Sequence, residues 1–394
     1  MVRRSKPNYF FIFIFACYIY ILTFHKEPTV QFQATSSDLI IHSPKSDSLN
    51  LDYKPQTEPT PTPEPKDPND IDVDIVYTYV DGDDPVWQAR KKKAEEQFGI
   101  KSSAKLDKAR YINIEEIRYS LRSVELFAPW VHHIFIVTDN QTIPFVKRNH
   151  PKITYIDHTQ ILPKFALPAY SAYVIEHGLI NVPGLSEYFI YLNDDFFFSR
   201  PTTKWEFFDK ETHLPIIYAK KNNWYNVHRQ YNIYRRSNIN DGDGEEFWAS
   251  IHYTVSACSN KTRAPPRGEV PHTMFASTLT LSRKMNQLFT YEINDTLKKH
   301  FRIFPDFQYQ HAVMQTCVAY RDLCKYVELE GSALYDNSRF FYYKGRDNPF
   351  EGINPKNSRS ICINSALGVT EEYYRNAKKF LESFLSKKSS FESD

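Results

Sequence analysis

The strongest constraint on the fold is a series of apolar, β-rich runs, with helix-forming segments among them, in the first half of the chain. The runs occupy residues 73–80, 133–139, 152–157 and 187–198. From Ile114 to Ala128, apolar residues recur every three or four positions, which predicts an amphipathic helix. This alternation predicts an α/β fold with a mainly parallel sheet and helices on its faces.

Acidic residues stand at the ends of these runs. Asp81 follows the first run, Asp139 ends the second, and the pair Asp194 and Asp195 lies inside the fourth. Ligands of parallel α/β sheets bind beyond the carboxyl ends of the strands, where these carboxylates would gather. Magnesium and manganese prefer hard oxygen ligands, often one or two carboxylates with phosphate oxygens. We therefore expect Asp194 and Asp195 to hold Mg²⁺ or Mn²⁺; a solvated turn is the alternative explanation of an Asp-Asp pair.

The composition argues against several classes of binding protein. The 394 residues include 49 Lys+Arg and 47 Asp+Glu, and the formal net charge of +2 provides no positive field for nucleic acid. Neither G-x-G-x-x-G nor G-x-x-x-x-G-K-[ST] occurs, so these glycine-rich phosphate loops are not expected. Among the 5 cysteines, Cys258, Cys317, Cys324 and Cys362 follow the N-terminal region. They permit two disulfides in three pairings, and buried free thiols are an equally open alternative.

The N-terminal region resembles a targeting segment and a linker more than a folded domain. Basic residues precede the apolar run, so the positive-inside rule places the N-terminus in the cytosol. We expect a cytosolic tail at 1–8, a transmembrane signal-anchor at 9–25, a proline-rich stalk at 26–70 and a luminal catalytic domain at 71–394. A cleaved signal peptide is the alternative.

This organisation predicts a single-pass type II membrane protein of the Golgi. Three N-x-[ST] sequons, at Asn140, Asn260 and Asn294, fit a luminal glycoprotein.

The second half of the chain gives weaker signals. Residues 222–236 mix aromatic and cationic side chains and could line an acceptor groove, although an exposed amphipathic segment explains them as well. The local sequence alone assigns no role to His272 or Arg302. Residues 370–386 have Glu early and Lys late, which predicts a final amphipathic helix.

Four blocks of the chain resemble the Stealth family of sugar-phosphate transferases. This family includes bacterial capsular polysaccharide phosphotransferases and N-acetylglucosamine-1-phosphotransferase. The first block is DIVYTYVDGDDPVW, and the second runs from RYINIEEIRYSLRSVELFAPWVHHIFIVTDNQ to PGLSEYFIYLNDDFFFSRP. The third runs from VPHTMF to FRIFPDFQYQHAV, and the fourth is ICINSALG with the final helix. One departure is Tyr79, which stands where Trp is common in the first block.

The resemblance implies a Rossmann-like nucleotide-sugar transferase fold of the GT-A type. It also implies metal-dependent transfer of a sugar 1-phosphate from a UDP- or GDP-sugar to a glycan hydroxyl, with release of the nucleoside monophosphate. Matched by position, the implied catalytic residues are Glu176, Asp195, His272 and Arg302. The corresponding substrate-binding residues are Asp74, Asp81 and Asp306.

In the implied reaction, charge accumulates on phosphoryl oxygens that Arg302 would bind bidentately. Either Glu176 or His272 would remove the proton of the acceptor hydroxyl. Arg118 and Arg122 would add contacts to the donor or, as an equal alternative, pack the helix.

The expected partners are the nucleotide-sugar donor, a glycan or glycoprotein acceptor and the membrane, with no nucleic acid; a homodimer is considered. Two rival functions stay open: a metal-dependent glycosyltransferase that releases the nucleoside diphosphate, and a glycan-binding protein without catalysis.

Overall fold

The computed structural model describes residues 70–100, 110–111, 113–221, 223–237, 245–364 and 368–393. The chain divides into two units, Met1–Glu58 and Pro59–Asp394, and the described residues all belong to the second. The predicted cytosolic tail and signal-anchor, and the stalk up to residue 69, lie outside the described residues. Within the described part, no helix combines the length and the apolar character needed to cross a membrane.

A five-stranded sheet forms the centre of the described unit, in the order β3-β2-β1-β4-β7. Its strands are β1 (Val73–Thr78), β2 (Ile134–Thr138), β3 (Ile153–Asp157), β4 (Tyr188–Asn193) and β7 (Phe275–Thr278). The pairs β1–β2, β1–β4 and β2–β3 are parallel, and β7 is antiparallel to β4. The prediction of an α/β fold with a mainly parallel sheet is therefore confirmed, and the carboxyl ends of four strands meet at one edge.

The fourth apolar run, predicted as one strand, is two strands in different sheets. β4 ends at Asn193, Asp194 and Asp195 form a turn, and Phe196–Phe198 is β5. β5 pairs with β10 (Ser360–Asn364), which in turn pairs with β9 (Ser338–Tyr342). The single-strand prediction was wrong because a continuous apolar pattern does not reveal where the chain changes sheets. The acidic pair thus lies at the junction of two sheets.

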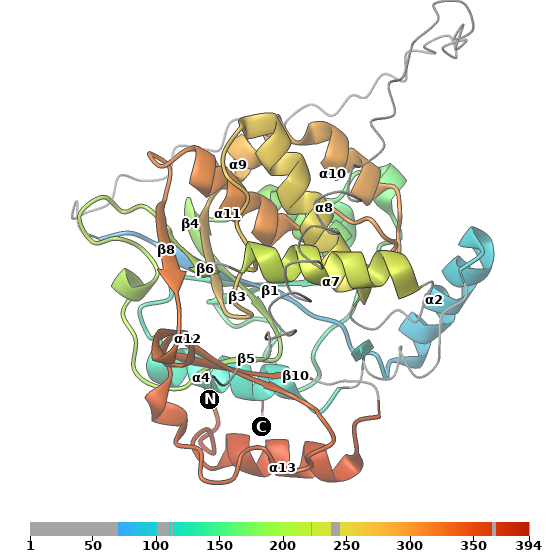
Figure 1. Ribbon diagram of the computed structural model, residues 1–394. Helices are drawn as coiled ribbons and strands as arrows, with labels where there is room; N and C mark the ends of the chain where they lie inside the picture. The colour runs from blue at the N-terminus through green and yellow to red at the C-terminus, as the bar shows by residue number, and fades with distance from the viewer. Residues whose placement is uncertain are drawn as a thin grey trace, which may run out of the picture. The chain divides into compact units, whose positions relative to one another are not determined.

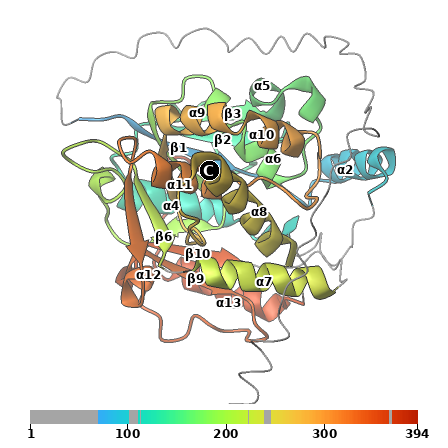
Figure 2. The ribbon, with the colours of Figure 1, turned by 45° about the horizontal axis from the view of Figure 1, so that its top comes forward.

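Helices cover both faces of the central sheet because successive residues of a strand point to opposite sides. Ile75 of β1 belongs to an apolar cluster with α4 (Glu116–Phe127) and α13 (Glu371–Glu382). Its neighbour Val76 belongs to a second cluster, with α8 (Glu245–Thr262), α9 (Leu279–Leu288), α10 (Thr290–Leu297) and α11 (Tyr309–Ala319). Figures 1 and 2 show α4 and α13 on one side of the sheet and α8, α9 and α11 on the other.

The remaining helices and strands lie around this core. They are α2 (Pro85–Phe98), α5 (His158–Ile161), α6 (Ala172–Glu176), β6 (Ile216–Lys220), α7 (Trp224–Ser237), β8 (Lys325–Leu329) and α12 (Ser332–Asn337). The two amphipathic helices predicted at 114–128 and 370–386 are confirmed as α4 and α13. The aromatic and basic segment forms α7, which contacts α8.

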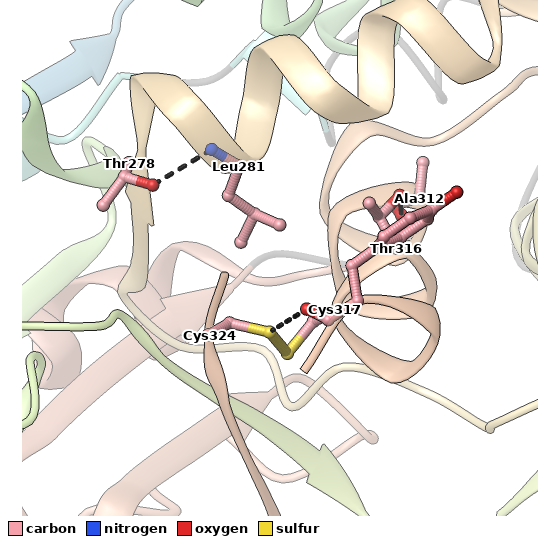
Figure 3. Close-up of a disulfide and its surroundings, with 7 residues drawn as sticks. Thr278, Leu281, Ala312, Thr316, Cys317 and Cys324 are labelled. Carbon is pink, nitrogen blue, oxygen red and sulfur yellow. Dashed lines mark hydrogen bonds between the residues drawn. A yellow bond between two sulfur atoms is a disulfide. The ribbon is translucent and has the colours of Figure 1, made fainter. Parts of the chain in front are cut away.

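The cysteines of the described part form one disulfide, between Cys317 of α11 and Cys324 just before β8. Figure 3 shows this bond beside the α9 segment that Thr278 caps. Cys258 and Cys362 are free and buried. The outcome combines the two open alternatives, one disulfide with two buried thiols.

Residues 391–393 are fixed against α4 and the segment before β3. The side chain of Glu392 is 1% exposed and accepts from Arg122, with Nε–Oε1 2.7 Å and Nη2–Oε2 2.8 Å. Arg118 Nη1 lies 3.0 Å from the same carboxylate. Val146 and Glu392 also form an antiparallel bridge. Arg122 therefore packs the helix, as one of the two sequence alternatives stated, and Arg118 adds a bond to the same carboxylate.

We predict that Glu392→Gln lowers the free energy of unfolding at pH 7 by about 3 kcal/mol, because it breaks a buried ion pair. Burial opposes the charge of Glu392, but hydrogen bonds from Arg122, Ser389 and Arg118 bring its pKa down from 4.5 to about 2. A carboxylate whose folded-state pKa is depressed stabilises above its unfolded pKa and loses that contribution as pH falls through the folded value.

Denaturant unfolding of the full-length chain between pH 7 and pH 2 checks this prediction. The difference between wild type and E392Q should shrink from about pH 4.5 toward pH 2. Glu351→Gln, at an exposed position, is the matched control. Equal stability of wild type and E392Q at pH 7 would contradict the assigned role.

Candidate active site

Carboxylates from separate segments gather at the carboxyl edge of the sheet. Asp194 and Asp195 form the turn after β4, and Glu116 begins α4. Burial raises the pKa of Asp194 well above its usual range, and the charges of Glu116 and Asp195 raise it further. Burial also raises the pKa of Glu116 to about 7, with hydrogen bonds opposing the rise and Asp195 and Asp83 adding to it. This concentration of like charge is one that a bound cation would offset.

The two carboxylate oxygens of Asp195 have different surroundings. Oδ2 accepts a hydrogen bond from the Cys362 thiol at 3.2 Å, and the backbone carbonyl accepts from Ile363 N, also at 3.2 Å. Oδ1 is buried and has no hydrogen-bond partner among the described residues. Burial raises the pKa of Asp195 to about 6, and the thiol bond acts in the opposite direction. An oxygen without a partner in this place is available to a ligand.

The residues fit a divalent ion that is shared with a phosphate ligand. Within the described ranges, no group of three or more His, Cys, Asp or Glu side chains is arranged to hold a metal by itself. Magnesium sites that use one or two carboxylates and complete the shell with water and substrate phosphates need no such group. Asp194 and Asp195, with the unpartnered Oδ1, provide that smaller set.

Glu176 is connected to the strand ends through a tyrosine. It is 7% exposed and ends α6. The hydroxyl of Tyr191 lies 3.1 Å from Glu176 Oε1, 2.8 Å from Asn193 Oδ1 and 3.1 Å from Thr78 Oγ1. Burial raises the pKa of Glu176 to about 7, while the Tyr191 bond and the charge of Arg302 act to lower it. Glu176 can therefore change its protonation state near neutral pH.

Arg302 interacts electrostatically with Glu176. Its guanidinium carbon is 4.6 Å from the centre of the Tyr173 ring. Burial opposes its charge, but the tyrosines and carboxyl groups around it, including Glu176, outweigh burial and raise the pKa of Arg302. A guanidinium that stacks through its face keeps its N–H edge for hydrogen bonds, which suits phosphate oxygens.

His272 lies next to the acidic turn. Its ring stacks on Phe196, with centroids 5.0 Å apart, and is tilted against Phe340 at 4.8 Å. Phe196 directly follows Asp195 in the chain. Burial lowers the pKa of His272 to about 4, assisted by the charge of Lys220, and Nδ1 has no hydrogen-bond partner. Arg302 thus interacts with Glu176, and Glu176 bonds to Tyr191 of the strand that ends at the acidic turn. His272 stacks on the residue that follows Asp195.

The structure does not bring Asp74 to these residues. Asp74 lies near the amino end of β1, opposite the edge that carries the acidic turn. Its Oδ1 is 2.8 Å from His132 Nδ1 and its Oδ2 accepts from Ser186 N at 2.7 Å. Both oxygens therefore hold neighbouring segments together. Asp74 therefore lies apart from the other predicted site residues, because a residue at the start of a parallel strand lies a full strand length from the ligand edge.

Asp306 supports the loop that carries Arg302. It is fully buried, its Oδ2 accepts from Ile303 N at 3.0 Å, and its Oδ1 lies 3.5 Å from Lys299 Nζ. Burial raises the pKa of Asp306 to about 7, and Lys299 and Arg302 oppose the rise. Its side chain contacts the loop, and its backbone bonds to Ser250 and Thr254 of α8.

A cavity of about 480 Å³ lies at the carboxyl end of β1. Asn113 Nδ2 donates to Asp81 Oδ1 at 3.0 Å in its wall, and the Arg118 guanidinium lies 3.7 Å from the centre of the Phe145 ring. The full lining is Tyr79, Asp81, Asn113, Glu115, Arg118, Pro144, Phe145, Lys388 and Ser393. Asp81 and Arg118, two of the predicted substrate-binding residues, therefore share one cavity, whereas Arg122 packs on Glu392.

Sequence reasoning missed several residues of this region. Glu116 reads as an ordinary acidic residue in the first turn of a helix, and Cys362 as a small apolar residue in a strand. Tyr191 is one of many aromatic residues in a buried strand. For Phe145, no local pattern points to a cavity. Only the acidic turn, bracketed by apolar residues, carried a signal in the sequence.

Comparison with known proteins identifies two conserved regions in this chain. Residues 72–99 match Stealth protein conserved region 1, and residues 110–215 match Stealth protein conserved region 2. The resemblance to the Stealth family is thereby confirmed. Glu176, Asp194 and Asp195 lie within region 2, whereas His272 and Arg302 lie outside both matched regions.

Named relatives share part of the chain. It is 44% identical over 134 residues to an exopolysaccharide phosphotransferase of Streptomyces coelicolor, covering 34% of this chain and 22% of that protein. It is 40% identical over 147 residues to the capsular polysaccharide phosphotransferase LcbA of Neisseria meningitidis, covering 37% and 40%. The matched part spans less than half of either relative.

Among solved structures, the chain is similar to the galactosyltransferase LgtC in complex with donor and acceptor sugar analogues. The sequences are 10% identical, 80% of this chain and 96% of that chain are covered, and the TM-score is 0.39. This similarity is too low to assign a fold type, and the GT-A type stays a prediction.

We predict that Asp194→Asn stabilises the metal-free protein, because it removes one negative charge from a buried group of carboxylates. In EDTA at pH 8, its thermal midpoint should exceed that of wild type by about 2 °C, the order that 1 kcal/mol produces in a large domain. Differential scanning calorimetry measures this shift. Asp322→Asn, at an exposed position, should leave the midpoint unchanged. A lower midpoint for D194N would show that this charge does not oppose folding.

Proposed function

We propose that this chain, which carries conserved regions 1 and 2 of the Stealth family, transfers a sugar 1-phosphate from a nucleotide sugar to a hydroxyl of a glycan. The main support is the arrangement at the sheet edge: an unpartnered carboxylate oxygen on Asp195 after β4, and Glu176 bonded to Tyr191 of the same strand and paired with the charge of Arg302. Such a set can bind a diphosphate and accept a proton. The relatives that share these regions carry the names of polysaccharide phosphotransferases.

The cavity at the end of β1 would receive the nucleoside of the donor. Its volume of about 480 Å³ falls within the range of small-molecule sites. The side chains of Asp81 and Asn113 offer hydrogen-bonding groups, and Phe145 offers a ring. The diphosphate would then extend toward Asp194 and Asp195. UDP- and GDP-sugars are both candidates for this donor.

Asp194 and Asp195 would hold Mg²⁺ or Mn²⁺ together with diphosphate oxygens. When bound, the ion neutralises charge on the diphosphate. Arg302 would bind the phosphoryl oxygens of the transferred group from the other side.

The reaction itself needs a proton acceptor. The acceptor hydroxyl attacks the phosphorus next to the sugar, the bond from that phosphorus to the nucleoside monophosphate breaks, and a phosphodiester forms. Glu176, whose pKa is about 7, takes the hydroxyl proton in this proposal. His272, whose pKa is about 4, is neutral at pH 7 and would orient the acceptor through a ring nitrogen.

We also propose that the described unit is the luminal, catalytic part of a type II Golgi membrane protein. Asn140 and Asn260 of the sequons are exposed, as glycan attachment requires. The acceptor would accordingly be a glycan or glycoprotein of the secretory pathway.

The released nucleotide distinguishes the proposed reaction from its closest rival. Full-length protein given UDP- and GDP-sugars with Mg²⁺ or Mn²⁺ and a glycan acceptor should release UMP or GMP, detected by chromatography. Release of UDP or GDP alone would identify a glycosyltransferase. No turnover, together with intact glycan binding by D195A and R302A, would favour a binding protein.

The pH dependence identifies the proton acceptor. The value of kcat/KM should fall as pH drops below about 7, because Glu176 must be ionised to accept a proton. Tyr191→Phe removes a hydrogen bond that favours the ionised form, so it should move this limb to higher pH. Glu176→Gln should lower kcat by about 10²–10⁴-fold.

His272→Gln provides the comparison. If Glu176 is the base, the kcat/KM of H272Q still falls as the pH drops below about 7. A limb that disappears in H272Q but persists in Y191F at its original pH would instead assign the role to His272.

A further inference from the structure

We propose that Cys362 is a positioning residue that turns the carboxylate of Asp195 so that Oδ1 faces the divalent ion. The inference rests on the proposed function, because it assigns the ion to Asp194 and Asp195. It adds a residue from another sheet, 167 positions away from Asp195 in the sequence.

The register of the second sheet places the thiol beside the acidic turn. Cys362 lies in β10, between β5 and β9, and its Cα partner in β5 is Phe196. Since Phe196 directly follows Asp195, the middle of β10 reaches the turn where the chain leaves the central sheet. Consecutive β10 residues then hold Asp195 by two bonds, the Cys362 thiol on Oδ2 and Ile363 N on the backbone carbonyl, each 3.2 Å long.

These two bonds fix both the backbone and the side chain of Asp195. The thiol bond on Oδ2 restricts rotation of the carboxylate and so sets the direction in which the other oxygen points. That oxygen, Oδ1, is the buried atom without a hydrogen-bond partner. The geometry therefore prepares Asp195 to bind an ion through one oxygen.

A thiol suits this task better than a stronger donor. The S–H group donates a single weak hydrogen bond and carries no positive charge. A lysine or arginine in place of Cys362 would compete with the ion for the same negative charge. Partners that orient a metal-binding side chain in this way typically change metal affinity by about 10–100-fold when removed.

The chain contains a matched control. Cys258 is also free and buried, but it lies in α8 within the apolar cluster on the other face of the central sheet. Replacing either cysteine with alanine removes the same atoms from a packed interior. Only Cys362 has its thiol hydrogen-bonded to Asp195.

The test is a titration of the full-length chain with Mn²⁺ alone, with free Mn²⁺ followed by its electron paramagnetic resonance signal. We expect Asp195→Asn to lose binding and Cys362→Ala to raise the dissociation constant about 10-fold or more. Cys362→Ser keeps a donor and should stay within about threefold of wild type, as should Cys258→Ala. Circular dichroism melts in EDTA verify that every variant folds.

The outcomes separate this inference from the proposed function. Equal Mn²⁺ affinity for wild type and C362A, while D195N loses binding, overturns the inference and leaves the metal site intact. Equal loss in C362A and folded C362S also overturns it, because the donor would then not matter. No Mn²⁺ binding by wild type, or unchanged binding by D195N, overturns the proposed metal site and the inference with it.

Discussion

The mutual repulsion of buried carboxylates at one turn is the interaction on which the rest of this structure depends. Burial raises the pKa of Asp194, Asp195 and Glu116. The charges of Glu116 and Asp195 raise the pKa of Asp194 further, and the charge of Asp195 raises that of Glu116. No fold gains stability from such a group alone. The turn is held in place because it joins two sheets and because α4 begins beside it. Packing of the two apolar clusters stabilises the fold and offsets the cost of the charged turn. Strained sites in other proteins are maintained by their surroundings in the same way.

The position of the turn between two sheets also explains how distant segments meet. β4 delivers the acidic pair from the central sheet, while β5 carries the next residues into a sheet with β10. His272 stacks on Phe196, the first residue of β5, so it reaches the turn from the segment before β7. Glu176 reaches the strand ends through the Tyr191 hydroxyl. Segments from separate parts of the chain therefore meet along β4 and the turn that follows it.

Local sequence patterns were sufficient to locate the four parallel strands of the central sheet and the helices α4 and α13, but not the antiparallel β7, and they said less about the site. The runs at β1, β2 and β3 and the helix periodicity of α4 and α13 record burial on a face, which local sequence expresses directly. The end of β4 was missed because Leu192 and Phe196 are equally apolar on either side of the change of sheet. The acidic turn was predicted because charge inside an apolar run is unusual.

The remainder of the site depends on tertiary pairing that no local pattern encodes. The importance of Cys362 comes from the β10 register, and that of Phe145 from its packing under Arg118. Asp74, which the family resemblance gave as a substrate-binding residue, holds His132 and Ser186 at the far end of β1. The family resemblance contributed Glu176, His272 and Arg302, which spacing alone would not have selected.

The bond between Asp195 and Cys362 joins residues 167 positions apart, and this separation has a kinetic consequence. Contacts between such distant residues form late, since the entropy of closing the loop must be overcome first. While the central sheet assembles, the carboxylates of the turn can remain hydrated and repel one another little. Full desolvation of the turn requires β10 to be in place, so the pairing that closes this long loop also completes the charged centre.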